Sequence, residues 1–114
     1  MYYPRILVDF DHTICPGGDE SNPPTHECLE VLNRLKATGY QICIFSVRSN
    51  SNQTQRKTGH QDMLDYLKRY NVPYDDIEYN KIHSHLIIDD RCCGIPLDRK
   101  KNVDWSKVKQ LLDL

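Results

Sequence analysis

The stretch Ile6–Phe10 reads Ile-Leu-Val-Asp-Phe and is followed at once by a second aspartate, Asp11. A short apolar run that does not alternate with polar residues is typical of a strand covered on both faces, as in a parallel sheet. A carboxylate is costly to bury without a partner, and two carboxylates two residues apart repel each other. We therefore expect a buried strand whose downstream end carries Asp9 and Asp11 and needs a compensating positive charge.

Two further runs, Ile42–Phe45 and Leu86–Ile88, have the same character, and a weaker strand is expected at Ile77–Tyr79. Three helical patterns accompany them, and the first two have apolar residues at i, i+3, i+4 and i+7. Pro23-Pro24-Thr25 is a start signal for the first helix, and Asp104 can cap the third. The expected buried positions are Cys28, Val31, Leu32 and Leu35, then Met63, Tyr66, Leu67 and Tyr70, then Trp105, Val108, Leu111 and Leu112. This succession predicts a three-layer α/β/α sandwich around a short parallel Rossmann-like sheet, with strand order 3-2-1-4.

The 114 residues are enough for one domain, which we expect to span residues 1–114. Apolar residues make up 39% and charged residues 27%, and the net charge of −1 argues against autonomous binding to double-stranded nucleic acid. No apolar run approaches the roughly 20 residues of a membrane span, and the first five residues do not resemble a signal peptide. Five irregularly spaced cysteines suit a reducing compartment, so we expect a cytoplasmic protein without membrane partners.

Each apolar run ends in a polar residue that core packing does not explain. Ser46 follows the second run, Asp89 and Asp90 follow the third, and Lys81 stands just ahead of the third. Because the downstream ends of parallel strands lie on one edge of a sheet, Asp9, Ser46 and Asp89 should meet there. A divalent cation with Lys81 beside it would offset the acidic cluster, and hard oxygen ligands favour Mg²⁺ over Zn²⁺.

The order of these residues resembles the motifs of the haloacid dehalogenase-like (HAD) phosphatases. In that family a strand ends in Asp-x-Asp-x-Thr or Val, a Ser or Thr follows a second strand, and a Lys and then paired acids follow. The matching residues here are Asp9-Phe10-Asp11-His12-Thr13, Ser46, Lys81 and Asp89-Asp90. The match spans most of the chain, and it departs from the family at His12, where many members carry glycine.

The resemblance implies a role for each of the acidic residues. Asp9 would be the nucleophile that forms an aspartyl phosphate, and Asp11 would protonate the leaving oxygen and later deprotonate the attacking water. Mg²⁺ would bind the Asp9 side chain, the Asp11 backbone carbonyl and Asp89, with Asp90 bound directly or through water. The implied activity is magnesium-dependent hydrolysis of a phosphomonoester.

The phosphoryl oxygens would be held by neighbouring polar and basic groups. Ser46 and Lys81 are the first candidates, and Thr13, which would also steady the turn after the nucleophile, is a third. Arg48 and Arg91 could each form a bidentate contact with substrate phosphate, and a surface ion pair is an equal alternative for either arginine.

The intervals that hold a cap domain in many HAD enzymes are short in this chain. Residues 14–25 are about as long as one flap hairpin, and residues 47–80 hold a polar loop, one helix and a weak strand. We therefore expect a capless domain with an open site, from which water is excluded by short loops, a partner copy in a homo-oligomer or the substrate itself. Capless members often act on large phosphorylated groups, including nucleic-acid ends, and small phosphomonoesters stay open as substrates.

Other functions compete with the phosphatase interpretation. A phosphotransferase would need an acceptor, and a non-catalytic binding or scaffold protein would keep the fold without turnover. A receiver domain of two-component signalling uses similar groups, but there the adjacent acids come first in the chain, which disfavours it here. A zinc site built from His83, His85 and Cys92-Cys93 is disfavoured, because adjacent cysteines do not readily chelate one ion.

Overall fold

The structure, a computed structural model, describes residues 4–46, 54–78, 86–90 and 95–114. The elements are β1 (Arg5–Asp9), the 3₁₀ turn η1 (Pro16–Gly18), α1 (His26–Ala37), β2 (Gln41–Phe45), α2 (Thr54–Arg69), β3 (Asp76–Glu78), β4 (Leu86–Ile88) and α3 (Trp105–Leu111). The weak strand expected at Ile77–Tyr79 is therefore present one residue earlier, and Tyr79 lies outside the described residues.

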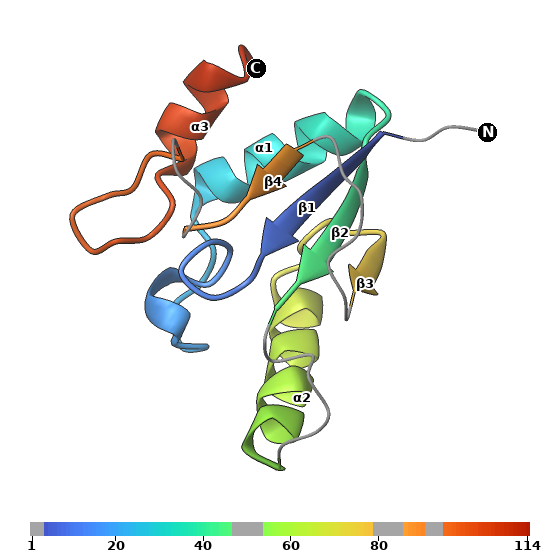
Figure 1. Cartoon of the computed structure of the whole chain (residues 1–114), viewed down its shortest axis with the longest axis vertical. Helices are drawn as coiled ribbons and strands as arrows, with labels where there is room; N and C mark the ends of the chain where they lie inside the picture. Colours follow the sequence, from blue (N-terminus) through green and yellow to red (C-terminus); the bar gives the residue numbers. More distant parts are fainter. Residues whose placement is uncertain (1–3, 47–53, 79–85, 91–94) are drawn as a thin grey trace.

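Within the described residues the strands form one four-stranded sheet in the order β3-β2-β1-β4, and every neighbouring pair is parallel (Figure 1). The predicted strand order and direction are confirmed, and the α/β architecture is compatible with a Rossmann-like fold. All four strands run the same way, so their carboxyl ends lie along one edge of the sheet. Asp9, Ser46 and Asp89 lie at or just beyond the strand ends along this edge.

Both faces of the central strands are buried. Ile6 and Val8 point to one face, and Leu7 points to the other, with at most 3% of any of these residues exposed. The face that carries Ile6 and Val8 shares a single hydrophobic core with all three helices. The structure thus describes one helical layer, and the second layer of the predicted sandwich is not among the described residues.

The N-cap predicted for α3 is present, and α1 begins directly after its predicted start signal Pro23-Pro24-Thr25. The Thr25 side chain accepts a hydrogen bond from the backbone N–H of Cys28 at 3.1 Å, and Asp104 accepts one from Lys107 at 3.2 Å. The expected buried positions of α1 and α2 are buried or, at Tyr70, packed against the core.

One expected core position of α3 is wrong, because Leu111 is 67% exposed. At about 100° per residue, Leu111 lies about 120° around the helix from Trp105, whereas Leu112 returns to the same side. Trp105 and Val108 are buried, and Leu112 packs against the core.

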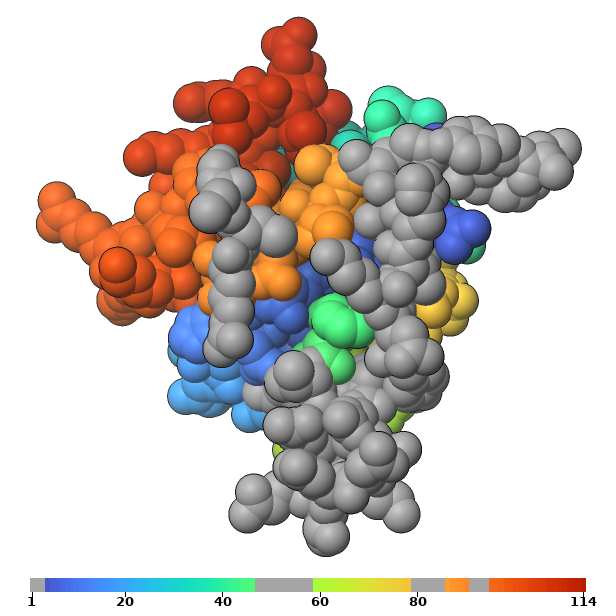
Figure 2. All heavy atoms as spheres, in the orientation of Figure 1, coloured from blue at the N-terminus to red at the C-terminus, as the bar shows by residue number. Residues whose placement is uncertain are grey.

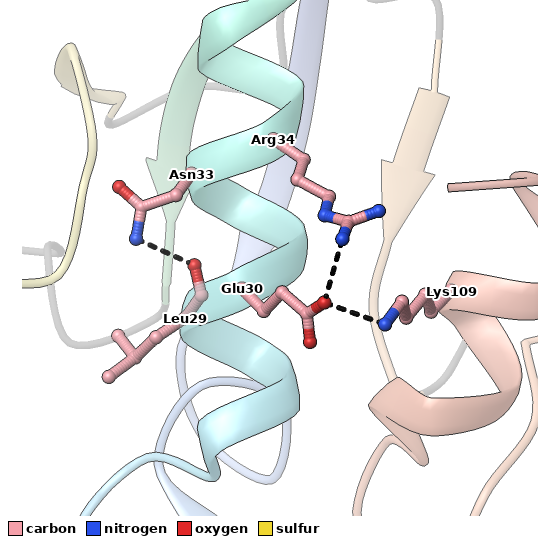
Figure 3. A network of polar contacts seen from close by, with 5 residues as sticks. All are labelled: Leu29, Glu30, Asn33, Arg34 and Lys109. Carbon is pink, nitrogen blue, oxygen red and sulfur yellow. Dashed lines mark hydrogen bonds and ion pairs between the residues drawn. The ribbon is translucent and has the colours of Figure 1, made fainter.

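Helices α1 and α3 lie side by side and share a small ionic network (Figure 3). One carboxylate oxygen of Glu30 lies 2.6 Å from the Lys109 Nζ and 3.2 Å from the Arg34 guanidinium. Partly exposed pairs of this kind each contribute little to stability, so the shared apolar core holds the two helices together. Within the described part of the chain, no helix combines the length and apolar character needed to cross a bilayer.

Candidate active site

The register of the sheet brings polar residues from three strands to one place. Asp9, the last residue of β1, pairs with Phe45 of β2, so Ser46 follows one residue beyond. On the other side of β1, Asp89 comes directly after the β4 residue that pairs with Val8. Figure 2 shows this edge, where the blue atoms of β1 and its following loop lie between the orange β4 segment and the green end of β2. The predicted convergence of Asp9, Ser46 and Asp89 follows from this register.

Three carboxylates gather at this edge. Asp9, Asp89 and Asp90 each offer one oxygen, and the three oxygens lie within 4.8 Å of one another. All three residues are half-buried, which leaves them less water than surface acids have. Three carboxylate oxygens at this spacing are a donor set suited to a hard divalent cation such as Mg²⁺.

Burial and two acidic neighbours set the electrostatics of Asp9. Burial, together with the neighbouring charges of Asp89 and Asp90, raises the pKa of Asp9 to about 8. The protein therefore holds Asp9 mainly in its protonated form at neutral pH when no cation is near. A cation bound by the three carboxylates would remove the repulsion and restore the Asp9 carboxylate, so the residues present fit a metal.

A tight turn follows β1 and carries Asp11. The carbonyl oxygen of Phe10 accepts hydrogen bonds from the backbone N–H groups of Thr13, Ile14 and Cys15 at 2.9–3.2 Å. Ile14 and Cys15 are fully buried, so the chain leaves the sheet only briefly before it returns to the core. Asp11 is therefore held on a short turn two residues beyond the end of β1, and its side chain is not part of the three-carboxylate cluster.

Thr13 links the turn to the acidic cluster. It is 3% exposed, and its hydroxyl donates to the Asp9 Oδ2 at 3.4 Å and accepts from the Asp90 N–H at 3.3 Å. These contacts within the protein favour the predicted role of Thr13 as a support for the turn over direct contact with a phosphate.

Glycine lets the loop after this turn approach Asp11 closely. Gly18 has φ +67°, and a Cβ added there would lie 3.2 Å from the Asp11 Oδ1 and 3.7 Å from the His12 Nε2. The Gly18 backbone therefore borders the space beside both side chains, and a side chain at that position would be strained and crowded.

The C-terminal segment, which here means residues 102–105, supports this turn through contacts that the sequence did not indicate. The Trp105 Nε1–H donates to the Thr13 carbonyl at 2.7 Å, and the Val103 N–H donates to the His12 carbonyl at 2.8 Å. The Asn102 side chain contacts both His12 and the backbone of Gly17. About 90 residues separate the partners, and no periodic pattern connects them, so these contacts could not be predicted from the sequence.

The ligands of the disfavoured zinc site, which are His83, His85, Cys92 and Cys93, lie outside the described residues. So do three residues predicted to take part in the site, which are Arg48, Lys81 and Arg91. Their assignments stay predictions, as do those of Ser46 and Thr13 as phosphate ligands. Ser46 is buried, with 4% exposed, one residue beyond the strand pair that includes Asp9.

Comparison with solved structures supports the fold. A crystal structure of a target protein from Vibrio cholerae matches with a TM-score of 0.54 and 18% identity, over 96% of this chain and 97% of that one. At this identity the likeness shows a shared fold only. A D,D-heptose 1,7-bisphosphate phosphatase from Burkholderia thailandensis matches at 16% identity and a TM-score of 0.43, over 66% of this chain and 52% of that one, which is too weak to carry an argument. No protein-family model matches the sequence, and no curated protein resembles it significantly.

Proposed function

We propose that this protein is a magnesium-dependent phosphomonoester hydrolase of the HAD type, which acts through an aspartyl phosphate on Asp9. The observation that carries the proposal is the cluster of Asp9, Asp89 and Asp90 at the carboxyl edge of the sheet. The sequence resemblance gives these carboxylates and Asp11 distinct roles, and the raised pKa of Asp9 fits a site built to receive a cation.

Asp9, Asp89 and Asp90 would hold the magnesium ion together with the backbone carbonyl of Asp11. The ion, when bound, neutralises charge on the carboxylates and on the phosphoryl oxygens. Ser46 and Lys81 would contact the remaining phosphoryl oxygens.

The chemistry would then run in two steps. The Asp9 carboxylate attacks phosphorus, the bond from phosphorus to the alcohol oxygen breaks, and Asp11 gives its proton to that oxygen. Water next attacks the aspartyl phosphate, and Asp11 takes up a proton from that water molecule. The second step releases inorganic phosphate and returns Asp9 and Asp11 to their starting states.

The short connection between β1 and α1 supports a proposal for the substrate class. Between β1 and α1 the chain forms loops and the 3₁₀ turn Pro16–Gly18. We infer an open, capless site, which suits a large phosphorylated group such as a nucleic-acid end as well as small phosphomonoesters.

Release of inorganic phosphate tests the proposal. The purified protein is given small phosphomonoesters and oligonucleotides with 5′ or 3′ phosphates, with and without magnesium. We expect magnesium-dependent release that is lost in Asp9→Asn and kept in Asp62→Asn, a matched change of an exposed aspartate on α2. No release from any substrate, or release that survives Asp9→Asn, would reject the proposal. Transfer to an added alcohol in place of water would assign a phosphotransferase instead.

A further inference from the structure

Asn102 joins the C-terminal segment to the turn that carries Asp11. Only 7% of Asn102 is exposed, and its Oδ1 accepts a hydrogen bond from the backbone N–H of Gly17 at 2.8 Å. The same oxygen lies 3.1 Å from the Nδ1 of His12. One amide oxygen thus holds both the His12 ring and the loop that follows it.

The Gly17 contact decides which way the Asn102 amide points. A backbone N–H can only donate, so the Asn102 atom that it meets must be the oxygen and not the amide nitrogen. That oxygen can only accept from His12, so the proton of the neutral imidazole sits on Nδ1. Because a neutral imidazole carries one ring proton, the Nε2 of His12 is then a hydrogen-bond acceptor.

The Nε2 of His12 lies on the side of the loop where Asp11 is found. Both Nε2 and the Asp11 Oδ1 are within 4 Å of the position that a Cβ atom would take at Gly18. A protonated Nε2 at that place would be a donor drawn to the Asp11 carboxylate. An unprotonated Nε2 cannot bind the carboxylate in this way.

Hydrogen bonds within residues 98–102 fix the position of Asn102. The Asp98 carboxylate accepts hydrogen bonds from the N–H groups of Lys100 at 2.9 Å and of Asn102 at 3.0 Å. The Asp98 N–H donates in turn to the Asn102 carbonyl at 2.8 Å, and Lys101 takes a positive φ of 69° between them. This closed turn presents the Asn102 side chain to His12 and Gly17.

We propose that Asn102 is a positioning residue, which holds His12 as the Nδ1–H tautomer so that Nε2 remains an acceptor beside Asp11. The consequence for catalysis rests on the proposed function. In that mechanism Asp11 exchanges protons with the leaving group and with water, and a donating Nε2 would compete for the same carboxyl oxygen. His12, which stands where many HAD enzymes carry glycine, is thereby kept from interfering with Asp11.

The tautomer can be read directly by NMR of the ¹⁵N-labelled histidines in the full chain. At about pH 8.5, where ordinary histidines are neutral, we expect the His12 signals of the Nδ1–H form. The His12→Gln variant identifies those signals by their loss. The Asn102→Ala variant should lose the preference for Nδ1–H, and Asn102→Asp, which keeps an acceptor oxygen, should retain it.

A matched control is available on α1. The side chain of exposed Asn33 donates to the Leu29 carbonyl of its own helix (Figure 3), so Asn33→Ala should leave the His12 tautomer unchanged. An Nε2–H tautomer in the wild type, or an unchanged tautomer in Asn102→Ala, would overturn the proposal. If Asn102→Ala does not fold, the wild-type and Asn102→Asp spectra still decide.

Kinetics separate positioning from simple support of the fold. For Asn102→Ala we expect kcat to fall about tenfold or more while KM changes little, with most of the loss recovered in Asn102→Asp. Wild-type kcat in a folded Asn102→Ala protein would overturn the catalytic part of the proposal. Absence of phosphatase activity in the wild type would reject the proposed function, and the NMR result would still decide how Asn102 holds His12.

Discussion

Asp9 is a half-buried carboxyl group whose neighbours Asp89 and Asp90 are carboxyl groups as well. Its pKa of about 8 lies above the value of about 4 expected in the unfolded chain. Between these two pH values Asp9 keeps its proton in the folded protein and has lost it in the unfolded chain. The free energy of unfolding of the metal-free protein should therefore fall as pH rises from about 4 to about 8. This loss of stability at higher pH is the free-energy cost of gathering three carboxyl groups at a site that is arranged for a cation.

The Asp9→Asn variant tests this cost. In the absence of divalent metal we expect it to be more stable than the wild type at about pH 8, by on the order of 1–3 kcal/mol, with a smaller difference near pH 4. Urea unfolding across this pH range measures the difference, and exposed Asp62→Asn on α2 is the control. A difference between Asp9→Asn and the wild type that does not vary with pH would contradict the assigned pKa.

Asp11 should differ from Asp9 because the proposed mechanism needs its side chain only for proton transfer. With a poor leaving group, Asp11→Asn should lower kcat by about 10²–10⁴-fold. A substrate with a good leaving group should recover part of the first step, while breakdown of the intermediate stays slow. Rapid-quench measurement of protein-bound phosphate should then show that phosphoenzyme accumulates. Equal losses for good and poor leaving groups, without phosphoenzyme, would contradict the role of Asp11.

Among the elements, α3 contacts the turn that follows β1. Trp105, its first residue, is 3% exposed and donates from the indole to the carbonyl of Thr13. In Trp105→Phe the buried carbonyl loses its donor, which should cost about 1–3 kcal/mol of unfolding free energy. Chemical denaturation measures this loss, and a change at exposed Leu111 to Ala on the same helix should cost far less. Equal costs for the two variants would contradict the assigned contact.

The elements themselves were predictable because each has a local signal. The apolar run of β1, the Thr25 cap and the spacing of Cys28, Val31, Leu32 and Leu35 in α1 all act within a few residues. Leu111 was misplaced because α3 is short and a shift of one residue turns a side chain away from the core. The support of the turn by Asn102 and Trp105 could not be predicted, because it joins residues about 90 positions apart through single hydrogen bonds.

In the whole molecule, metal binding and stability should be linked. A cation that binds only the folded protein should raise the melting temperature as its concentration rises. We expect millimolar magnesium to raise the Tm of the wild type and to have much less effect on Asp89→Asn, which lacks one of the three carboxylates. Differential scanning calorimetry with magnesium and then with EDTA measures this. The same magnesium-dependent shift in both proteins would contradict the metal site.

The strand order of the whole sheet was predictable from the sequence because parallel strands in this succession allow few topologies. From the predicted strand order alone, Asp9, Ser46 and Asp89 were expected at one edge of the sheet. The electrostatic state of Asp9 was not predictable in the same way. It depends on how deeply the carboxyl group is buried and how near Asp89 and Asp90 come, which are properties of the folded molecule.

The claim that Asp9 accepts the phosphoryl group while magnesium is bound can be tested with beryllofluoride, which mimics an aspartyl phosphate. Fluorine NMR of the protein with beryllofluoride should show a bound, magnesium-dependent species in the wild type and in Asp11→Asn, whose backbone carbonyl is unchanged. The species should be absent in Asp9→Asn. A bound species that persists in Asp9→Asn, or none in the wild type with magnesium, would contradict the claim.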